Sequence, residues 1–279
     1  MTPNRDHSPL VIGIDCGTQS LRAALYRPDG FCLAAAAHPY PTSRPGVNRA
    51  EQNPEDWWNA LKCCVRQCME QAHVHREEVA ALACDGTSCT VVFSRADGRP
   101  IRPALLWMDI RAGLEAREVE ATNDPVLRNC GGHVSAEWLL PKVMWINRHE
   151  PDVYKSSHKI VDSADWLIHR LTGCWITSNS NAAAKRHWTP DGGWPYSLYA
   201  GVGLGELAAR SPDDVVYLGQ PAAPLLAEVA DTLGLSANCV VAHAGMDGWT
   251  APIGKGCFAP GCASLTLGTS TVLILETDA

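Results

Sequence analysis

The stretch that most constrains the fold of this chain is "GIDCGTQSLRAALYRPDG" at residues 13–30, where an acid and a Gly-Thr pair separate two apolar runs. Residues 11–15 alternate toward the acid, residues 21–26 are apolar again, and a Pro-Asp-Gly turn leads into a third run at 31–37. Apolar runs divided by tight turns predict a meander of three antiparallel strands. Because neither GxGxxG nor GxxxxGK[ST] follows the first strand, a Rossmann or P-loop phosphate site does not fit.

A helix and further strands are predicted after the meander. Asn53 is a good helix cap, Pro54 suits the first helical turn, and apolar residues recur at helical spacing through residues 57–68. Residues 79–84 and 90–93 are apolar runs next to turn signals, which indicates two more strands.

The middle of the chain, at about residues 110–199, is rich in tryptophan and predicted to be largely helical. In "SADWLIHRLTGCW" we expect Ser163 to cap a helix and Gly173 to end it. Residues 179–223 mix Asn, Gly, Pro and short apolar runs, which predicts loops and brief helices. The last segment predicts a strand, an acid among small residues, and two strands joined by a Gly-Thr-Ser turn.

Size and charge exclude several classes of function. With 279 residues and 46% hydrophobic side chains, the chain can bury a sizeable core as one large or two modest domains. Its 30 acidic and 23 basic side chains argue against sequence-independent binding to nucleic acid or anionic lipid. No apolar run approaches the roughly 20 residues that span a bilayer, and the first residues lack signal-peptide features. We therefore expect a cytoplasmic protein with no membrane or nucleic-acid partner.

Cysteine and histidine give no metal motif. The twelve cysteines contain no CxxC pair, and we expect reduced, buried, small hydrophobic residues rather than a disulfide framework or a zinc site. The ten histidines form no HExxH, so none is assigned a metal or catalytic role.

Three turns repeat a Gly-Thr pair followed by a polar residue. Glycine lets successive backbone N–H groups point to one side, and the hydroxyl adds a donor, so such a turn can hold phosphate oxygens. A single Gly-Thr pair is nevertheless more often only a tight turn. Asp15, immediately before the first turn, could hold a hydrated Mg²⁺ against the phosphates. The three turns are Gly17-Thr18-Gln19, Gly86-Thr87-Ser88 and Gly268-Thr269-Ser270.

Asp247 is a second candidate acid, in "AHAGMDGWTAPIG". The small residues around it leave room for a substrate, and a carboxylate placed on a hydroxyl can act as a general base. Asp247 could equally cap a helix that follows at Gly248. The phosphate-type turn nearby favours the catalytic interpretation.

Two aromatic blocks, "LLWMDIRA" and "EWLLPK", are candidates for ligand binding. In an extended stretch Trp107, Asp109 and Arg111 would face one side, while Trp138 and Lys142 lie one helical turn apart. An aromatic platform with an acid and a base fits a polyhydroxylated ligand. A salt-bridged surface strand and a core tryptophan explain the same spacing.

Taken in order, these blocks resemble the FGGY family of carbohydrate kinases, in the superfamily of sugar kinases, actin and heat-shock ATPases. The first phosphate motif of that family resembles "GIDCGTQSLRAALYRPDG", and the helix that follows resembles "NRAEQNPEDWW". The sugar-contacting segment resembles "LLWMDIRA", the helical insert "DWLIHRLTG", and the domain junction "AGMDGWTAPIGKGCFAPG" with "SLTLGTS". The resemblance covers nearly the whole chain.

The resemblance implies an α/β, ribonuclease-H-like fold with a mixed sheet, flanking helices and a helical insert. Residues 1–260 would be the sugar-binding N-terminal domain, and residues 261–279 would begin the C-terminal nucleotide-binding domain. The implied function is ATP-dependent phosphorylation of a terminal hydroxyl of a small sugar or polyol. This chain would be the sugar-binding half, with little or no turnover alone. The block "EWLLPK" resembles ribulokinase-type members, which favours a ketopentose or pentitol.

The resemblance also assigns roles residue by residue. Asp247 would take the proton of the sugar hydroxyl, and Asp15 would hold Mg²⁺ through water. The family junction more often has Gln, Asn or Ala after Asp, whereas this chain has Gly248 and then Trp249. The transferred phosphate would contact Gly17, Thr18 and Gln19, the ATP phosphates Gly268, Thr269 and Ser270, and the sugar Trp107, Asp109, Arg111, Trp138, Lys142 and Asp247.

Two other functions fit the sequence as well. The chain could be a stand-alone sugar-binding or regulatory protein without kinase activity, or an actin-like or chaperone ATPase that binds nucleotide without sugar. We expect the apolar strands near residues 265–275 to form an exposed edge that associates or docks, which leaves a homodimer open.

Overall fold

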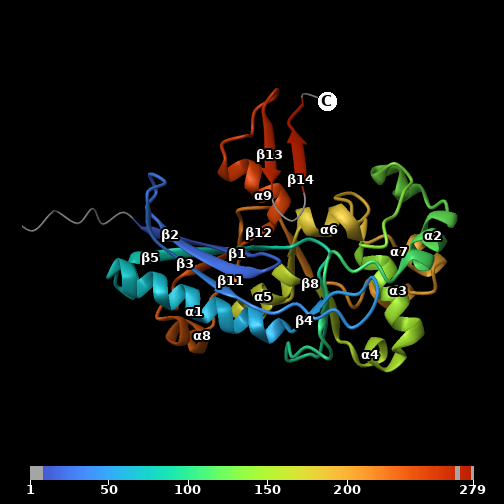
Figure 1. The fold of residues 1–279 in the computed structure, drawn as a ribbon, viewed down its shortest axis with the longest axis horizontal. Coiled ribbons are helices and arrows are strands. Elements are labelled where there is room, and N and C mark those ends of the chain that lie inside the picture. The colour runs from blue at the N-terminus through green and yellow to red at the C-terminus, as the bar shows by residue number, and fades with distance from the viewer. Residues whose placement is uncertain (1–8, 268–270, 278–279) are drawn as a thin grey trace, which may run out of the picture.

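The computed structural model describes residues 9–267 and 271–277 (Figure 1). Its strands are β1 Leu10–Cys16, β2 Ser20–Tyr26, β3 Cys32–Pro39, β4 Glu51–Gln52, β5 Val79–Gly86, β6 Val91–Ser94, β7 Ala104–Leu105, β8 Lys159–Asp162, β9 Ile176–Ser178, β10 Asp214–Val216, β11 Pro221–Pro224, β12 Val240–Met246, β13 Ala263–Leu267 and β14 Thr271–Leu275. Its α-helices are α1 Pro54–Ala72, α2 Gly113–Ala121, α3 Leu139–His149, α4 Pro151–Ser156, α5 Ser163–Thr172, α6 Asn179–Arg186, α7 Tyr196–Gly201, α8 Ala227–Leu233 and α9 Asp247–Gly254. Short 3₁₀ helices lie at Arg76–Glu78, Pro125–Cys130 and Gly205–Leu207.

A six-stranded mixed sheet in the order β11-β12-β5-β1-β2-β3 organises the first part of the core. Strands β1, β2 and β3 form the predicted antiparallel meander. Strands β1, β5 and β12 run parallel to one another. The carboxyl ends of these three strands therefore meet at one edge of the sheet.

Helices α1 and α5 cover this sheet. The Asn53 side chain accepts a hydrogen bond from the Glu55 amide at 3.2 Å, and Pro54 opens α1 as predicted. Helix α1 packs on β2 and β3, and α5 packs on β5 and β12. Trp57 and Trp166 join the two helices in an edge-to-face contact with ring centroids 6.1 Å apart. Figure 1 shows α1 and α8 lying below the sheet in that view.

The prediction that Ser163 caps α5 is wrong, because Asp162 is the cap. Asp162 and Asp165 form a capping box in which each side chain accepts from the backbone N–H of the other. A carboxylate is a strong acceptor at a helix N-terminus. Ser163 is the first helical residue instead, and its hydroxyl donates to the Thr87 carbonyl at 3.2 Å. Gly173, with φ of 76°, ends the helix as predicted.

A second core supports the helical lobe drawn in green at the right of Figure 1. The short strands β4, β7, β6 and β8 form a four-stranded sheet beside it. Apolar residues of β6 and β7 pack with those of α2, α3 and α7. The predicted helical character of residues 110–199 is confirmed, and residues 179–223 contain brief helices and short strands.

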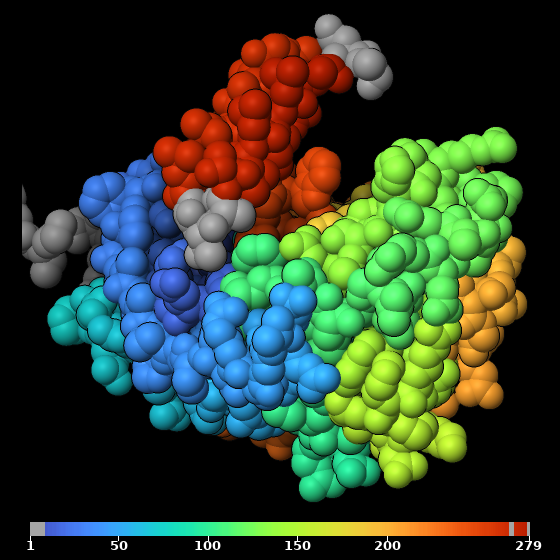
Figure 2. All heavy atoms as spheres, turned by 45° about the vertical axis from the view of Figure 1, so that its right-hand side comes forward, coloured from blue at the N-terminus to red at the C-terminus, as the bar shows by residue number. Residues whose placement is uncertain are grey.

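Strands β13 and β14 form an antiparallel hairpin, as predicted, with Ala263 opposite Leu275. Figure 2 shows the hairpin standing out from the body of the protein. Residues 268–270, which connect the two strands, lie outside the described residues. Four leucines of the hairpin are more than half exposed, namely Leu265, Leu267, Leu273 and Leu275.

All twelve cysteines are free thiols, as predicted. Seven of them are buried, but Cys32, Cys63 and Cys174 are exposed, contrary to the expected burial. No helix within residues 9–267 and 271–277 is both long and apolar enough to cross a lipid bilayer.

Candidate functional site

Three carboxylates come from the edge where β1, β5 and β12 end. Asp15 of β1 lies opposite Asp85 of β5 in parallel register. Gly245 of β12 lies opposite Asp85 on its other side, and Asp247 follows two residues later. Because neighbouring strands are about 4.8 Å apart, the three acids share one small region. The structure thus brings the two predicted acids, Asp15 and Asp247, to the same edge.

The first Gly-Thr turn connects β1 to β2 at this edge. The Gly17 amide donates to the Ser20 carbonyl at 3.2 Å and closes the turn. The Thr18 carbonyl accepts from Gln52 Nε2 at 2.7 Å, which holds the turn from β4. Within the described part of the chain, the amide hydrogens of Thr18 and Gln19 have no acceptor. The turn therefore offers two backbone donors to an anion.

Asp247 begins α9, so the helix-start interpretation is correct in position, although Met246 is the cap residue. Its Oδ1 accepts a hydrogen bond from the Gly248 amide at 2.7 Å. Burial raises the pKa of the Asp247 carboxyl, the Gly248 amide lowers it, and Asp15 raises it further. A carboxylate with a raised pKa is a better proton acceptor. Trp249, the departure from the family pattern, is 53% exposed on α9.

Asp85 is a residue of this site that sequence reasoning missed. Its Oδ1 is buried and has no hydrogen-bond partner among the described residues. Burial raises the pKa of Asp85 to about 8, and the charges of Asp15 and Asp247 add to that effect. A signal was available, because Asp85-Gly86-Thr87 repeats the acid before a Gly-Thr pair that marks the first turn.

Lys185 of α6 is the second missed residue. Burial, the Gly248 amide and Asp15 have the larger effects on the pKa of the Asp247 carboxyl. The Lys185 ammonium lies close enough to lower that pKa by a smaller amount. In the part of the chain that the structure describes, the Lys185 ammonium makes no hydrogen bond or ion pair. A lysine at this place can donate to a sugar hydroxyl or to a phosphate. Only its position in the polar helix after residue 178 could have drawn attention to it.

The segment that holds Trp107, Asp109 and Arg111 is a series of turns, so the expected extended stretch is wrong. Asp109 is fully buried, accepts from the Ala50 amide at 2.8 Å and pairs with Arg111 at 2.6 Å. Although burial acts in the opposite direction, the hydrogen bonds from Arg111 and Ala50 hold the pKa of Asp109 below its usual range. Arg111 also pairs with Glu51 at 2.6 Å. These contacts bind the turns to β4.

Trp107 remains half-buried, and its indole Nε1 donates to Thr18 Oγ1 at 2.9 Å. Trp138 is also half-buried and starts α3, with its ring 5.6 Å from that of His187. These two rings are the aromatic surfaces that the structure leaves accessible among the predicted sugar residues.

Lys142, one turn after Trp138 as predicted, lies behind the site. Its ammonium is fully buried and donates to the Cys89 carbonyl at 2.9 Å and the Leu106 carbonyl at 2.6 Å. Burial lowers the pKa of Lys142 to about 8. The amine thus joins the loop before Trp107 to the turn at Cys89.

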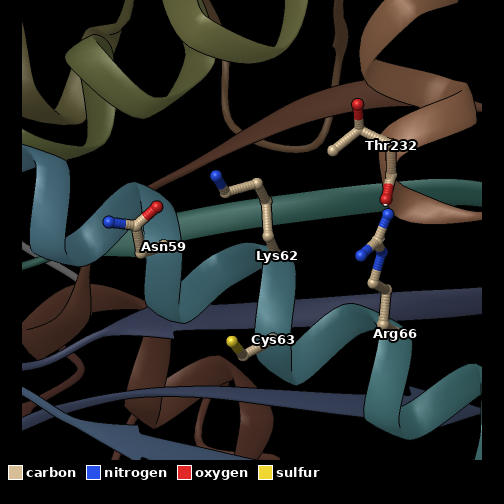
Figure 3. Close-up of a pocket in the computed structure, with 5 residues that line it drawn as sticks. All are labelled: Asn59, Lys62, Cys63, Arg66 and Thr232. Carbon is tan, nitrogen blue, oxygen red and sulfur yellow. Dashed lines mark hydrogen bonds between the residues drawn. The ribbon is translucent and has the colours of Figure 1, made fainter.

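A separate shallow pocket lies between α1 and α8, on the helical face of the sheet (Figure 3). Its lining includes Arg66, whose Nε donates to the Thr232 carbonyl at 2.5 Å. None of the candidate acids contributes to it. The other lining residues are Asn59, Lys62 and Cys63.

Sequence comparison identifies relatives of this chain. A family model described as the N-terminal domain of the FGGY family of carbohydrate kinases matches residues 10–254. The chain is 30% identical over 271 residues to the xylulose kinase of Escherichia coli K12, and the alignment covers 94% of this chain and 53% of that protein. It is 28% identical over 281 residues to a D-ribulokinase of Saccharomyces cerevisiae, and that alignment covers 91% of this chain and 39% of the relative. The chain spans about half the length, or less, of these relatives.

Solved structures share the fold. The xylulose kinase from Rhodospirillum rubrum matches with a TM-score of 0.86 and 26% identity, covering 96% of this chain and 55% of that one. A glycerol kinase from Plasmodium falciparum has the same fold at 18% identity, with a TM-score of 0.83 over 96% of this chain and 54% of that one. The expected α/β fold of the sugar-kinase superfamily, with a mixed sheet and a helical insert, is confirmed. The chain therefore belongs to the FGGY family of carbohydrate kinases.

Proposed function

We propose that this chain is the sugar-binding half of an ATP-dependent kinase that phosphorylates a terminal hydroxyl of a small sugar or polyol. The observation that carries the proposal is the position of Asp247, a largely buried carboxylate at the strand edge that also holds the Gly17-Thr18-Gln19 turn. Relatives are named xylulose kinase and D-ribulokinase, which favours a ketopentose, with a pentitol as the second choice.

Asp247 is proposed as the general base. It accepts the proton of the terminal hydroxyl while that oxygen forms a bond to the γ-phosphorus of ATP. The bond between the γ-phosphorus and the oxygen that bridges it to the β-phosphate breaks, and ADP leaves. Proton transfer of this kind contributes roughly 10² to 10⁴ in rate. The raised pKa of Asp247, caused first by burial, supports this role.

The residues at the strand edge fit a magnesium nucleotide. Asp15 is 37% exposed, and among the described residues it pairs only with Arg22, at 2.9 Å, so its carboxylate can reach a hydrated ion. Within residues 9–267 and 271–277, no three His, Cys, Asp or Glu side chains could hold a metal together. Mg²⁺ keeps several waters and is bound through one or two carboxylates plus phosphates, so the carboxylate of Asp15 is a sufficient protein ligand. When bound, ATP·Mg²⁺ supplies the phosphoryl group and neutralises its charge.

Backbone donors complete the phosphate site. The free amides of Thr18 and Gln19 are placed to bind the transferred phosphoryl oxygens, and Gly17 gives the turn its tight path. Gly268, Thr269 and Ser270 are proposed to hold the ATP phosphates from the hairpin connection.

The sugar pocket is proposed to combine contact residues with residues that hold them. Trp107, Trp138 and Lys185 would contact the sugar. Asp109, Arg111 and Lys142 would act from behind through their buried hydrogen bonds to the loop that carries Trp107. Because these three groups are largely buried, their effect on affinity would be indirect.

The share of the relatives that this chain covers supports a division into a sugar-binding and a nucleotide-binding domain. We propose that residues 1–260 form the sugar-binding domain and that residues 261–279 belong to the nucleotide-binding domain.

Calorimetric titration tests this function. The chain is titrated with ribulose, xylulose, ribitol, erythritol and glycerol, with and without MgATP, and sugar phosphate is measured at stoichiometric protein. We expect saturable binding of one ketopentose or pentitol without ATP, a loss of at least about tenfold in affinity in Asp247→Ala, and little turnover. The exposed Asp191→Asn is the matched control and should bind as the wild type does.

Two results would overturn the proposal. Clear ATP binding with no sugar binding would favour an actin-like nucleotide switch. Sugar binding that is unchanged in Asp247→Ala would favour a sugar-binding protein without kinase chemistry.

A further inference from the structure

A β-bulge interrupts β12 just before Asp247. His243 lies opposite Cys84 of β5, whereas Gly245 lies opposite Asp85, so Ala244 is an extra residue in β12. Gly245 has a φ of +89°, which glycine adopts without strain. An extra residue in a strand reverses the faces on which the following side chains lie. The bulge therefore sets the direction in which the chain leaves β12 and enters α9, which begins at Asp247.

His243 holds the backbone of this bulge. Its side chain is fully buried, and its Nδ1 lies 3.0 Å from the Gly245 amide nitrogen. Because an amide can only donate, Nδ1 is the acceptor, and the ring hydrogen lies on Nε2. Nε2 is 2.8 Å from Oδ1 of Asp165, to which it donates.

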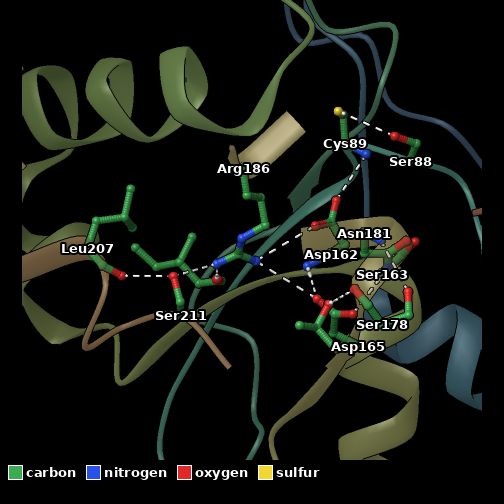
Figure 4. A network of polar contacts seen from close by, with 12 residues as sticks. Ser88, Cys89, Asp162, Ser163, Asp165, Ser178, Asn181, Arg186, Leu207 and Ser211 are labelled. Atoms are coloured by element: carbon green, nitrogen blue, oxygen red, sulfur yellow. Dashed lines mark hydrogen bonds and ion pairs between the residues drawn. The ribbon is translucent and has the colours of Figure 1, made fainter. Parts of the chain in front are cut away.

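Asp165, which accepts from His243, belongs to a buried polar network. Figure 4 shows Asp165 together with its neighbours Asp162, Asn181 and Arg186. Oδ1 of Asp165 also accepts from Asn181 Nδ2 at 3.1 Å, and its Oδ2 accepts from the Asp162 amide at 3.2 Å. Arg186 Nη1 lies 3.9 Å from Oδ2 of Asp165 and 3.7 Å from Asp162. The network joins α5 and α6 to β12, so His243 is fixed to a rigid part of the core.

Thr250 also holds the bulge. Its hydroxyl, on the first turn of α9, lies 2.8 Å from the Ala244 carbonyl and 2.9 Å from the Met246 carbonyl. The peptide group between Ala244 and Gly245 is therefore bound at both its N–H, by His243, and its C=O, by Thr250. His243 and Thr250 thus bind three backbone groups of the last residues of β12, immediately before Asp247.

We propose that His243 is a positioning residue that sets the direction of Asp247 by holding the amide of Gly245. This inference rests on the proposed function, in which Asp247 is the base. Removing the acceptor at Nδ1 frees the bulge, and Asp247 then loses its place relative to the sugar hydroxyl. A general base needs its reacting atoms within about 3 Å, so a small displacement lowers both affinity and rate.

Two substitutions of His243 separate this role from a merely structural one. In His243→Asn, the amide oxygen takes the place of Nδ1 and keeps an acceptor for Gly245, while the donor to Asp165 is lost. In His243→Gln, the amide nitrogen reaches the place of Nε2 and keeps the donor to Asp165, while the acceptor for Gly245 is lost. Both disturb the same buried site. The buried His169→Gln, on α5, is the control for a general loss of stability.

Three measurements are made on each variant. The first is amide hydrogen exchange at Gly245 and at Gly248, whose amide donates to Asp247 Oδ1. The second is sugar affinity by calorimetry, and the third is the free energy of unfolding. We expect His243→Gln to speed exchange at both glycines. It should also weaken sugar binding by about tenfold, the effect of losing the hydrogen bond between the sugar hydroxyl and the charged Asp247 carboxylate. His243→Asn should stay near the wild type in exchange and affinity although it also loses stability.

Equal effects of the Asn and Gln variants would overturn the inference, as would faster exchange at Gly245 with no change at Gly248. If the wild type binds no sugar, the proposed function fails. The exchange rates at Gly248 still decide whether His243 controls Asp247, so the two failures are distinguishable.

Discussion

Trp107 donates a hydrogen bond of 2.9 Å from its indole Nε1 to Oγ1 of Thr18. The two residues are 89 positions apart in the sequence and belong to different parts of the site. Thr18 lies in the turn proposed to bind phosphate, and Trp107 lies in the loop proposed to bind sugar. The bond therefore connects the turn proposed to bind phosphate to the loop proposed to bind sugar.

We predict that Trp107→Phe and Thr18→Val each lower the free energy of unfolding by about 1 kcal/mol, the usual net value of one hydrogen bond. Because both changes remove the same bond, the double variant should lose clearly less than the two losses added together. Urea denaturation of the four proteins gives this double-mutant cycle. Strictly additive losses would mean that the bond contributes nothing.

The elements of the first sheet could be predicted because their signals are local. The alternation around Asp15 and the Asn53-Pro54 pair before α1 are contained in short stretches of sequence, and both predictions are confirmed. The fate of Asp109 could not be predicted in the same way. Its burial depends on a hydrogen bond from the Ala50 amide and on Glu51, which pairs with the same Arg111 as Asp109 does. Ala50 and Glu51 are distant from Asp109 in the sequence.

The candidate site shows the same division. Asp15 and Asp247 stand beside recognisable Gly-rich segments, whereas Asp85 becomes part of the site only through the parallel register of β5 with β1 and β12. His243 stands in the same stretch as Asp247 but matches no metal or catalytic motif, and its contact with Gly245 exists because β12 contains a bulge. Register and bulges depend on tertiary pairing, which a single sequence does not display.

A side chain at position 245 should be tolerated less well than a side chain at position 234, where a glycine has a similar backbone conformation. A Cβ at Gly245 would lie 2.7 Å from Leu218 Cδ2 and 3.3 Å from Ser180, whereas a Cβ at Gly234 would meet nothing within 4 Å. Both glycines have positive φ, at +89° and +72°. We predict that Gly234→Ala loses about 1 kcal/mol from backbone strain alone and that Gly245→Ala loses clearly more. Thermal or urea unfolding compares the two, and equal losses would contradict the close packing at the bulge.

Asp109→Asn should destabilise the fold. Asp109 is fully buried and paired with Arg111, and removing one partner of a buried pair costs about 3–5 kcal/mol because the other charge stays buried. The exposed pair of Asp29 with Arg27 is the control, and Asp29→Asn should leave the unfolding free energy nearly unchanged. Urea denaturation measures both. A loss of sugar affinity with unchanged stability in Asp109→Asn would instead make Asp109 a direct sugar ligand.

The stability of the protein should respond to acid through His169. Its ring stacks on Trp175 with centroids 3.6 Å apart, and burial, with a smaller effect of Arg170, lowers the pKa of His169 to about 4 from 6.5. The unfolded chain therefore binds more protons than the folded protein between pH 4 and 6.5, and the free energy of unfolding falls as the pH is lowered through that range. Above pH 6.5 this contribution is constant.

We predict that His169→Gln makes the fall between pH 6.5 and 4 shallower by about 3 kcal/mol at most. The same change at His133, whose side chain is 90% exposed, should leave the slope as it is in the wild type. Urea denaturation at half-unit steps of pH measures the three slopes. Other buried groups add their own pH dependence to each curve, but they are common to the three proteins and cancel in the difference. A slope in His169→Gln equal to that of the wild type would mean that His169 can be protonated inside the folded protein without cost.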